Sequence, residues 1–469
     1  KTKVLTHRAV FLMSEGVEPS GILAVTFTNK AAEEMRERIG NLLGMKNFSQ
    51  KMRFSKSLPW VGTFHSFCAS VLREDIEKLG YPSNFVIYND QDQTALIKEA
   101  INKLGMKEEN IDAWRAKDAI SKAKNELLDP ENFAASAQGY TQIKIAQIYD
   151  FYQKKLKENK SLDFDDLLLL GLKVLREYPD ILKKWQEKFQ HILVDEYQDT
   201  NAAQYNIVKL LSGRKGNVFV VGDIDQSIYS WRGADFRNIL QFEQDFPEAK
   251  VVKLEENYRS TQNILEAANF LIEKNVNRKE KNLWTKNEAG PLIKLVHVTD
   301  EKMEASFVVD EIIRLKNEEK IKLDDIAVLY RTNAQSRVLE EYLIEAGITY
   351  QLIGAFKFFE RKEIKDLLAW ARFIFNTEDT IGLKRVLESM PLGLGSAKAE
   401  EVVAFLSKEN FIKGESGGLN KISRRDQALT NFKNLILDLK KSLAQDKPSV
   451  FLEKVAQKSG YLKRLEGLK

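Results

Sequence analysis

The chain has 469 residues, a length typical of about three domains, and 43% of them are hydrophobic, enough for ordinary globular cores. Its 72 basic and 68 acidic residues leave a net charge of +4, which neither requires nor excludes nucleic acid. The single cysteine, Cys68, excludes a disulfide framework and favours a reducing, cytoplasmic compartment. No apolar run approaches the roughly 20 residues that cross a bilayer, so we expect no membrane partner.

The chain starts with Lys1-Thr2-Lys3-Val4, without an initiator Met and without the regions of a signal peptide. We therefore expect it to be cut at its front. In the first part of the chain, short apolar runs alternate with helical patterns, which indicates a parallel α/β sheet. Strands are predicted at Ile22–Thr28, Val61–Phe64, His191–Val194 and Asn217–Gly222, and helices at Asn29–Leu43 and from about residue 65 to Leu79.

Residues 88–160 have a charged, helix-periodic pattern, which predicts a helical insertion into this α/β domain. A second α/β block follows, with strands expected at Leu292–Val298, Ile326–Tyr330 and Thr349–Ile353. After Gly354 the chain is helical and Lys-rich, with a Gly-containing break expected at Gly414–Gly418. The Lys-rich composition fits a phosphate-facing surface or a solvated helical face. The predicted division is 1–87 and 161–256 for the first α/β domain, 88–160 for its insertion, 257–353 for the second α/β domain and 354–469 for a second helical insertion.

Asp195 and Glu196 directly follow the strand His191–Val194. Such a pair can serve a nucleotide-hydrolysing site, because one carboxylate can hold Mg²⁺ and the other can deprotonate an attacking water. A solvated strand end is the alternative. Lys1-Thr2 matches the last two positions of a phosphate-binding loop, where the lysine reaches phosphates and the threonine ligates Mg²⁺. Taken alone, two residues could also match by coincidence.

The segment Gly222–Ala234 is rich in unusual residue types. Gln226 can hydrogen-bond a γ-phosphate or its attacking water, and Tyr229 and Trp231 can stack on unpaired bases. The alternative is an aromatic core plug with a salt-bridged Arg232. Further on, Arg259 could neutralise charge on a γ-phosphate and Tyr258 could stack on a nucleobase. A structural ion pair of Arg259 with a neighbouring glutamate, Glu255 or Glu256, is the alternative there.

Taken together and in order, these segments resemble the motif series of the UvrD/PcrA/Rep group of superfamily-1 DNA helicases. The resemblance covers residues 1 to about 400, and the matching segments are Thr26–Ala32, Gly62–Ser66, Asp163–Leu167, Val194–Thr200, Val221–Ala234, Asn257–Ser260, Tyr330–Arg337 and Phe359–Asp366. It implies two RecA-like parallel-sheet motor domains of the P-loop NTPase type with two helical insertions.

The resemblance also implies roles for individual residues. Glu196, Gln226 and Arg259 would be catalytic, Lys1, Thr2 and Tyr258 would bind ATP, and Thr2 and Asp195 would hold Mg²⁺. The positions that match the family's DNA track are Phe27, Asn29, His65, Tyr229, Trp231, Arg232, Arg331, Asn333 and Arg337. The implied activity is ATP-driven movement from 3′ to 5′ along single-stranded DNA, with unwinding at single-strand/duplex junctions in repair or replication.

Two further family motifs have no match after Gly354, so we expect a chain truncated at both ends and a poor or inactive ATPase by itself. Two alternatives stay open. The chain could be the motor portion of a helicase–nuclease of the RecB/AddA group, although the short first insertion favours the simpler helicases. It could also be a non-hydrolysing DNA-binding remnant, although the presence of Glu196, Gln226 and Arg259 argues against that. The sequence names no protein partner.

Overall fold

The computed structural model describes residues 1–45, 58–107, 111–213, 216–275, 281–353, 361–389 and 424–466. The chain forms two compact units, the first mainly from residues 1–254 and 365–469 and the second from residues 255–276 and 281–364. The expected Gly-containing break at 414–418 lies outside the described residues. Within the described ranges, no helix is long and apolar enough to cross a bilayer.

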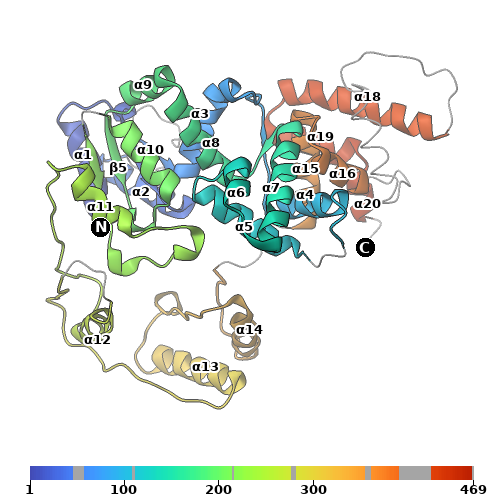
Figure 1. The fold of residues 1–469 in the computed structure, drawn as a ribbon. Coiled ribbons are helices and arrows are strands. Elements are labelled where there is room, and N and C mark those ends of the chain that lie inside the picture. Colours follow the sequence, from blue (N-terminus) through green and yellow to red (C-terminus); the bar gives the residue numbers. More distant parts are fainter. Residues whose placement is uncertain are drawn as a thin grey trace. The chain divides into compact units, whose positions relative to one another are not determined.

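The first unit is built around a four-stranded parallel sheet in the order β2-β1-β5-β6. Figure 1 labels β5 of this sheet and the helices around it. The strands are β1 (Ile22–Thr26), β2 (Trp60–Thr63), β5 (His191–Val194) and β6 (Val218–Val220). Val25 pairs with Gly62 on one side and with Val194 on the other. All four predicted strands of this block are confirmed, with ends that differ by at most two residues.

Helices cover both faces of this sheet, because alternate residues of a strand point to opposite sides. Ile22 and Ala24 face a core shared with α1 and α2, whereas Leu23 and Val25 face a core shared with α3, α8, α9 and α10. These helices are α1 (Thr2–Ser14), α2 (Asn29–Leu42), α3 (Phe64–Asp75), α8 (Phe164–Glu177), α9 (Pro179–Lys188) and α10 (Ala202–Ser212); α11 (Arg237–Asp245) follows β6.

In the described part of the segment in which the sequence predicts a helical insertion, there are four α-helices. They are α4 (Asp90–Lys103), α5 (Ala113–Asn125), α6 (Pro130–Ser136) and α7 (Gly139–Glu158). The two-residue strands β3 (Val86–Ile87) and β4 (Ser161–Leu162) pair in parallel where the chain enters and leaves this segment. The helices enclose a core of their own. The five-part division of the chain stays a prediction.

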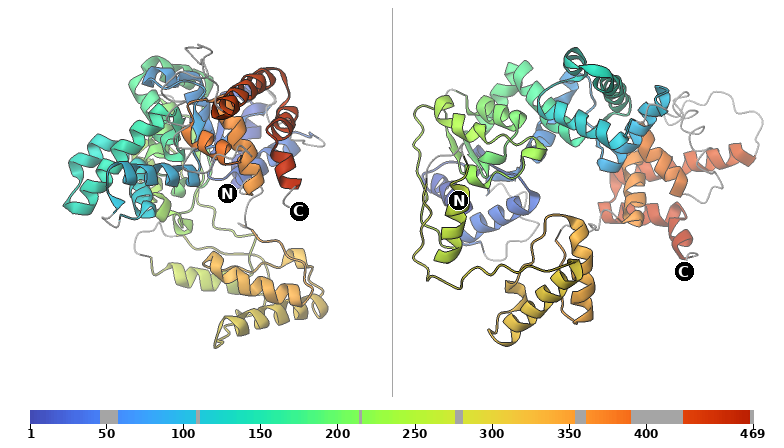
Figure 2. Two further views of the ribbon diagram at one scale, coloured as in Figure 1. Left: turned by 90° about the vertical axis from the view of Figure 1, so that its right-hand side faces the viewer. Right: turned by 60° about the horizontal axis from the view of Figure 1, so that its bottom comes forward.

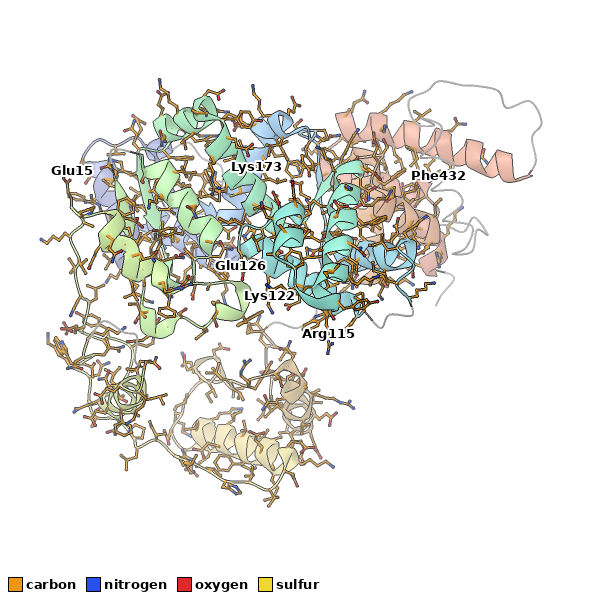
Figure 3. All side chains as sticks on the ribbon, in the orientation of Figure 1. Glu15, Arg115, Lys122, Glu126, Lys173 and Phe432 are labelled. Atoms are coloured by element: carbon orange, nitrogen blue, oxygen red, sulfur yellow. The ribbon has the colours of Figure 1, made fainter. Side chains whose placement is uncertain are left out.

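Among the residues that the structure describes, the remaining helices of the first unit come from the C-terminal part of the chain. They are α15 (Lys362–Phe375), α16 (Thr380–Ser389), α18 (Arg424–Gln445), α19 (Pro448–Lys458) and α20 (Tyr461–Glu466). Phe432, labelled in Figure 3, packs against Trp370 and Phe373 in their core. Arg372 on α15 bonds Asp92 on α4, so a polar contact joins these helices to the segment between β3 and β4.

The second unit contains α12 (Gln262–Ile272), α13 (Glu301–Asn317) and α14 (Ser336–Glu345), joined by long extended segments (Figure 2). Its small core consists of Val309, Ile312 and Leu343 with partly buried neighbours. The strands predicted at 292–298, 326–330 and 349–353 differ from the structure, since the described residues there form no ladder. A parallel strand needs hydrogen-bonded neighbours and covering layers. Here, Leu295 is 96% exposed and Leu329 93% exposed.

Candidate active site

The site predicted in the first unit lies at the carboxyl edge of its sheet. Because all four strands are parallel, the segments that follow them emerge at the same edge, where open α/β sheets bind ligands. Phe27 follows β1, His65 follows β2, and Asp195 follows β5. Gln226 closes the short helix η6 (Ile224–Gln226), which follows β6.

Asp195 contacts the first turn of α1. The hydroxyl of Thr2 donates to Oδ2 of Asp195 at 2.9 Å, and the backbone N–H of Asp195 donates to the carbonyl of Val25 at 2.9 Å. Burial raises the pKa of Asp195, and the hydrogen bond from Thr2 partly offsets that rise. Thr2 and Asp195 therefore present two oxygen ligands side by side at the end of β5.

These two oxygens fit a Mg²⁺ ion. Mg²⁺ usually takes one or two protein carboxylates and completes its octahedron with phosphate and water. A hydroxyl next to one carboxylate meets that requirement. In the part of the chain that the structure describes, no group of three or more His, Cys, Asp or Glu side chains could form an all-protein metal cage.

Glu196 has an unusual backbone for a non-glycine residue, with φ at +50° and ψ at 48°. This left-handed conformation directs the chain into the short helix η5 (Tyr197–Asp199). Lys1 Nζ lies between two site residues, 2.9 Å from Oε2 of Glu196 and 2.8 Å from Oε1 of Gln226. Partial burial acts to raise the pKa of Glu196, but the hydrogen bonds from Lys1 and Gln198 outweigh it and lower the pKa.

Two residues that received no role in the sequence analysis complete a ring of hydrogen bonds. The amide of Gln198 donates to Oε2 of Glu196 at 3.0 Å and accepts from the backbone N–H of Asp223 at 2.8 Å. Oδ2 of Asp223 in turn accepts from Nε2 of Gln226 at 2.9 Å, which leads back to Lys1. Gln198 is only 1% exposed. In the sequence, only its position in the motif-like segment Val194–Thr200 indicated that Gln198 could belong to the site.

Aromatic side chains lie at the same edge of the sheet. The rings of Phe27 and Tyr229 stack with centroids 4.7 Å apart, and the Trp231 ring lies 6.3 Å from that of Tyr229. Trp231 is 65% exposed, so the alternative of an aromatic core plug is wrong for this residue. The side chain of Arg232 lies outside the described residues, and its backbone belongs to the short helix η7 (Ser230–Arg232).

His65 and Asn29 are the two further residues of the first unit that the sequence predicts to bind DNA. His65 contacts Phe164 edge-on at 6.0 Å, and burial lowers its pKa to about 4, so its imidazole is neutral at pH 7. A neutral imidazole can donate and accept hydrogen bonds without adding charge. Asn29 is exposed at the first position of α2.

The other predicted site residues lie in the second unit. Tyr258 and Arg259 are exposed, and Oε2 of Glu256 accepts from the hydroxyl of Tyr258 at 2.7 Å. Glu256 also pairs with Lys286 at 3.1 Å. In the turn at 331–335, Oε1 of Gln335 accepts from the backbone N–H groups of two neighbours at 3.0 and 2.9 Å. This turn and the start of α14 carry Arg331, Asn333 and Arg337.

Comparison with known protein families shows to which family the chain belongs. The model of the UvrD/REP helicase N-terminal domain matches residues 1–247, which is more than half of the chain. The chain belongs to the UvrD/REP helicase family. The model of the UvrD-like helicase C-terminal domain matches residues 252–445. Both RecA-type motor domains of the expected fold are therefore represented in this family member.

Individual relatives agree with the family match. The chain is 44% identical over 447 residues to the ATP-dependent DNA helicase PcrA of Bacillus subtilis, covering 93% of this chain and 59% of the relative. It is 43% identical over 476 residues to PcrA of Staphylococcus aureus, covering 99% of this chain and 63% of the relative. PcrA of Staphylococcus epidermidis matches at 43% identity with the same coverage. The chain thus spans about three fifths of the length of these curated relatives.

Proposed function

We propose that this UvrD/REP family chain acts in an ATP-dependent DNA helicase that moves from 3′ to 5′ along single-stranded DNA and unwinds single-strand/duplex junctions in repair or replication. One observation carries the proposal. The predicted nucleotide residues of the first unit and the stacked aromatic residues lie at the same edge of one parallel sheet. The proposal is supported by the names of the relatives, which describe them as ATP-dependent DNA helicases. DNA as substrate favours a cytoplasmic location.

The nucleotide half of the proposal assigns a role to each residue. Lys1 binds the phosphates of ATP, and Thr2 and Asp195 hold Mg²⁺, which neutralises charge on the phosphates when bound. Glu196 accepts a proton from the attacking water, and Gln226 hydrogen-bonds the γ-phosphate. From the second unit, Arg259 contributes positive charge to the γ-phosphate and Tyr258 stacks on the adenine.

The DNA half of the proposal rests on aromatic and polar side chains. Phe27, Tyr229 and Trp231 offer ring faces on which unpaired bases can stack regardless of sequence. The polar and charged residues would contact bases or the phosphate backbone: Asn29, His65, Arg232, Arg331, Asn333 and Arg337. A track of this composition favours single strands, because paired bases do not expose their faces.

Glu196→Gln in the full-length protein tests the proposed chemistry. The glutamine keeps the length of the side chain and an oxygen that can accept from Lys1, but it removes the proton acceptor. We expect the kcat of DNA-stimulated ATP hydrolysis to fall by about 10²–10⁴-fold, while binding of a fluorescent ATP analogue persists. Glu187→Gln, at an exposed glutamate on α9, is the matched control. Turnover by Glu196→Gln within a few-fold of the parent would exclude Glu196 as the base.

A further inference from the structure

The turn that presents Tyr229 and Trp231 has a shape fixed by a glycine. The backbone N–H of Gly233 donates to the carbonyl of Ser230 at 3.0 Å, and the φ of Gly233 is +80°. Side chains other than glycine rarely adopt this conformation, because their Cβ would crowd the backbone. Gly233 therefore closes the turn just after its exposed tryptophan.

The same glycine packs against Asn125, the last residue of α5. A Cβ placed on Gly233 would lie 3.1 Å from Cβ of Asn125 and 3.3 Å from its Cγ. At these distances a side chain could fit only if Asn125 moved. The backbone of the turn therefore packs against the side chain of Asn125, which belongs to the helical segment between β3 and β4.

Both the nitrogen and the oxygen of the Asn125 side-chain amide form hydrogen bonds. Nδ2 donates to the carbonyl of Ser121 at 2.8 Å and to Oδ1 of Asp165 at 3.3 Å. Oδ1 accepts from Nδ2 of Asn201 at 2.6 Å. A leucine has neither donor nor acceptor, and an aspartate would place a second carboxylate beside Asp165. Only an amide satisfies all three neighbours.

The preceding residue of α5 holds this end of the helix in place. Lys124 is fully buried and bonds both Asp163 and Asp166, each at 2.7 Å, at the start of α8. Lys122 and Glu126, labelled in Figure 3, are exposed on the other side of the same helix. The inner face of the last turn of α5 is thus the part that contacts the rest of the first unit.

The opposite side of the aromatic turn is bonded to the segment that carries the two carboxylates. The backbone N–H of Asp235 donates to the carbonyl of Thr200 at 3.0 Å, and Nδ2 of Asn238 donates to the same carbonyl at 2.8 Å. Thr200 precedes Asn201, the partner of Asn125, in the segment that begins with Asp195 and Glu196. The turn is therefore supported from two sides, by this segment and by Asn125.

We infer that Asn125 is a positioning residue for single-stranded DNA binding, because it supports the turn that carries Tyr229 and Trp231 without being one of the stacking residues. The inference rests on the proposed function, since it assumes that these rings bind DNA. It gives the helical segment between β3 and β4 a defined contribution to DNA binding. Replacing Asn125 should move the rings relative to Phe27 and weaken base stacking, while the ring of hydrogen bonds around Lys1 stays in place.

The test compares Asn125→Leu, which is close in size, with Lys122→Leu on the exposed face of the same helix. Binding of a fluorescently labelled oligothymidine is measured by anisotropy, and ATP hydrolysis is measured against DNA concentration. For Asn125→Leu, we expect the Kd for the oligonucleotide and the DNA concentration for half-maximal hydrolysis to rise together by about three- to tenfold. The KM for ATP at saturating DNA should stay within about twofold of the parent. Lys122→Leu should match the parent in every measurement.

A double-mutant cycle with Trp231→Ala separates positioning from general destabilisation. If Asn125 acts through the turn, adding Asn125→Leu to Trp231→Ala should weaken DNA binding by less than it does alone. Gly233→Ala disturbs the same contact from the other side without altering α5, and it should raise the Kd in the same way.

Additive losses in the cycle would overturn the inference, as would parent-like DNA binding by Asn125→Leu. A fall in melting temperature with a parallel loss of every activity in both Asn125→Leu and Gly233→Ala would also overturn it. The proposed function fails separately if the parent protein itself neither binds the oligonucleotide nor hydrolyses ATP.

Discussion

Lys124 shows how a single buried charge can tie two helices together. Its ammonium group is enclosed by Asp163, Asp166 and the rings of Tyr149 and Tyr152. Burial acts against its charge, but the two carboxylates outweigh this effect and raise the pKa of Lys124. Loss of one partner in such a group is more damaging than the net strength of the group suggests, because the remaining charges stay buried.

Lys124→Met should therefore reduce the free energy of unfolding by about 3–5 kcal/mol at pH 7. The methionine fills a similar volume but leaves two carboxylates without their cation. Chemical denaturation followed by circular dichroism measures the change, with Lys122→Met at the exposed site as control. A loss as small as that of the control would show that water or a rearranged side chain replaces the lysine.

The same variant should depend on pH in a defined direction. Burial and the charge of Asp163 raise the pKa of Asp166 to about 6, and burial also raises that of Asp165 to about 6. A carboxyl whose pKa is raised by folding loses stability when it ionises in the folded protein. The stability that comes from its protonated form is therefore present below about pH 4 and is lost as the pH rises through about 6. Without Lys124 the cost of ionisation increases. The destabilisation by Lys124→Met should thus be smaller at pH 5 than at pH 7, and equal losses at both pH values would contradict this explanation.

Trp231 gives a second prediction for a single side chain. Because the indole is largely exposed, Trp231→Ala removes a stacking face with little loss of core packing. Affinity for single-stranded DNA should fall by about 1–3 kcal/mol, measured by anisotropy, with a melting temperature close to that of the parent. A large drop in melting temperature would show that the ring supports the fold instead.

At the level of helices and strands, α15 and α16 meet the helical segment that follows β3 through a buried polar contact. Arg372 on α15 bonds Asp92 at 2.7 Å and Asp379 at 3.1 Å, and the hydroxyl of Tyr88 donates to Asp379 at 2.7 Å. Asp379 is fully buried. Nearby, Lys160 and Glu378 form a more exposed ion pair across the same contact.

Arg372→Met should therefore destabilise the first unit by about 3–5 kcal/mol, since it leaves the buried carboxylate of Asp379 without its cation. Adding Asp379→Asn should recover part of this loss, because the asparagine can still accept from Tyr88 without carrying a charge. Denaturant unfolding of the single and double variants measures both effects. Lys160→Met, at the exposed pair, should have little effect, and a double variant no more stable than Arg372→Met would contradict the explanation.

The elements that the sequence predicted well are those with a strong local pattern. β1 and β5 each contain a run of consecutive apolar residues, Ile22–Val25 and Ile192–Val194, and α4 to α7 have helical periodicity, so both were recognisable without tertiary information. β3 and β4 have only two residues each and exist through their pairing with each other. The extended segments of the second unit have strand-like composition but pair with no neighbour among the described residues, and composition alone does not report pairing.

The candidate site was predictable to a similar extent. The motif resemblance singled out Lys1, Thr2, Asp195, Glu196 and Gln226. In the structure, Lys1 contacts Glu196 and Gln226, and Thr2 contacts Asp195. Gln198 and Asn125 received no role, because the partners that define their positions are distant in the sequence and their residue types are common. These partners are Asp223 for Gln198, and Asp165 and Asn201 for Asn125. Hydrogen bonds of this kind follow from the packing of whole elements, which no local pattern encodes.

On the scale of the whole molecule, the two compact units differ in how much apolar surface they bury. Within the described residues, the first unit contains four separate cores, whereas the core of the second consists of three buried residues from α13 and α14. Local stability follows buried contacts and hydrogen-bonded backbone. The units should therefore not unfold as one cooperative system.

Hydrogen exchange of the chain 1–469 tests this difference. Amides of β1 and β5 should exchange slowest, because these strands are bonded on both sides and buried. Amides at 292–298 and 326–330 should exchange within the shortest labelling time, since the described backbone there forms no ladder. Mass spectrometry of peptic fragments resolves the two sets, and equal protection in both would contradict the predicted order of stability.

Because Cys68 is buried, the first unit is suited to site-specific labelling at an introduced cysteine. Its thiol is completely buried on α3, with Sγ only 3.0 Å from where a Cβ on Gly171 would lie, and burial raises its pKa. Maleimides react with exposed thiolates, and the chain contains no other cysteine. A cysteine introduced at an exposed position, such as Lys122→Cys on the outer face of α5, would therefore take up a fluorophore while the native thiol stays unmodified. Fluorescence could then follow the helix on which the aromatic turn rests, in a protein whose natural cysteine is left in place.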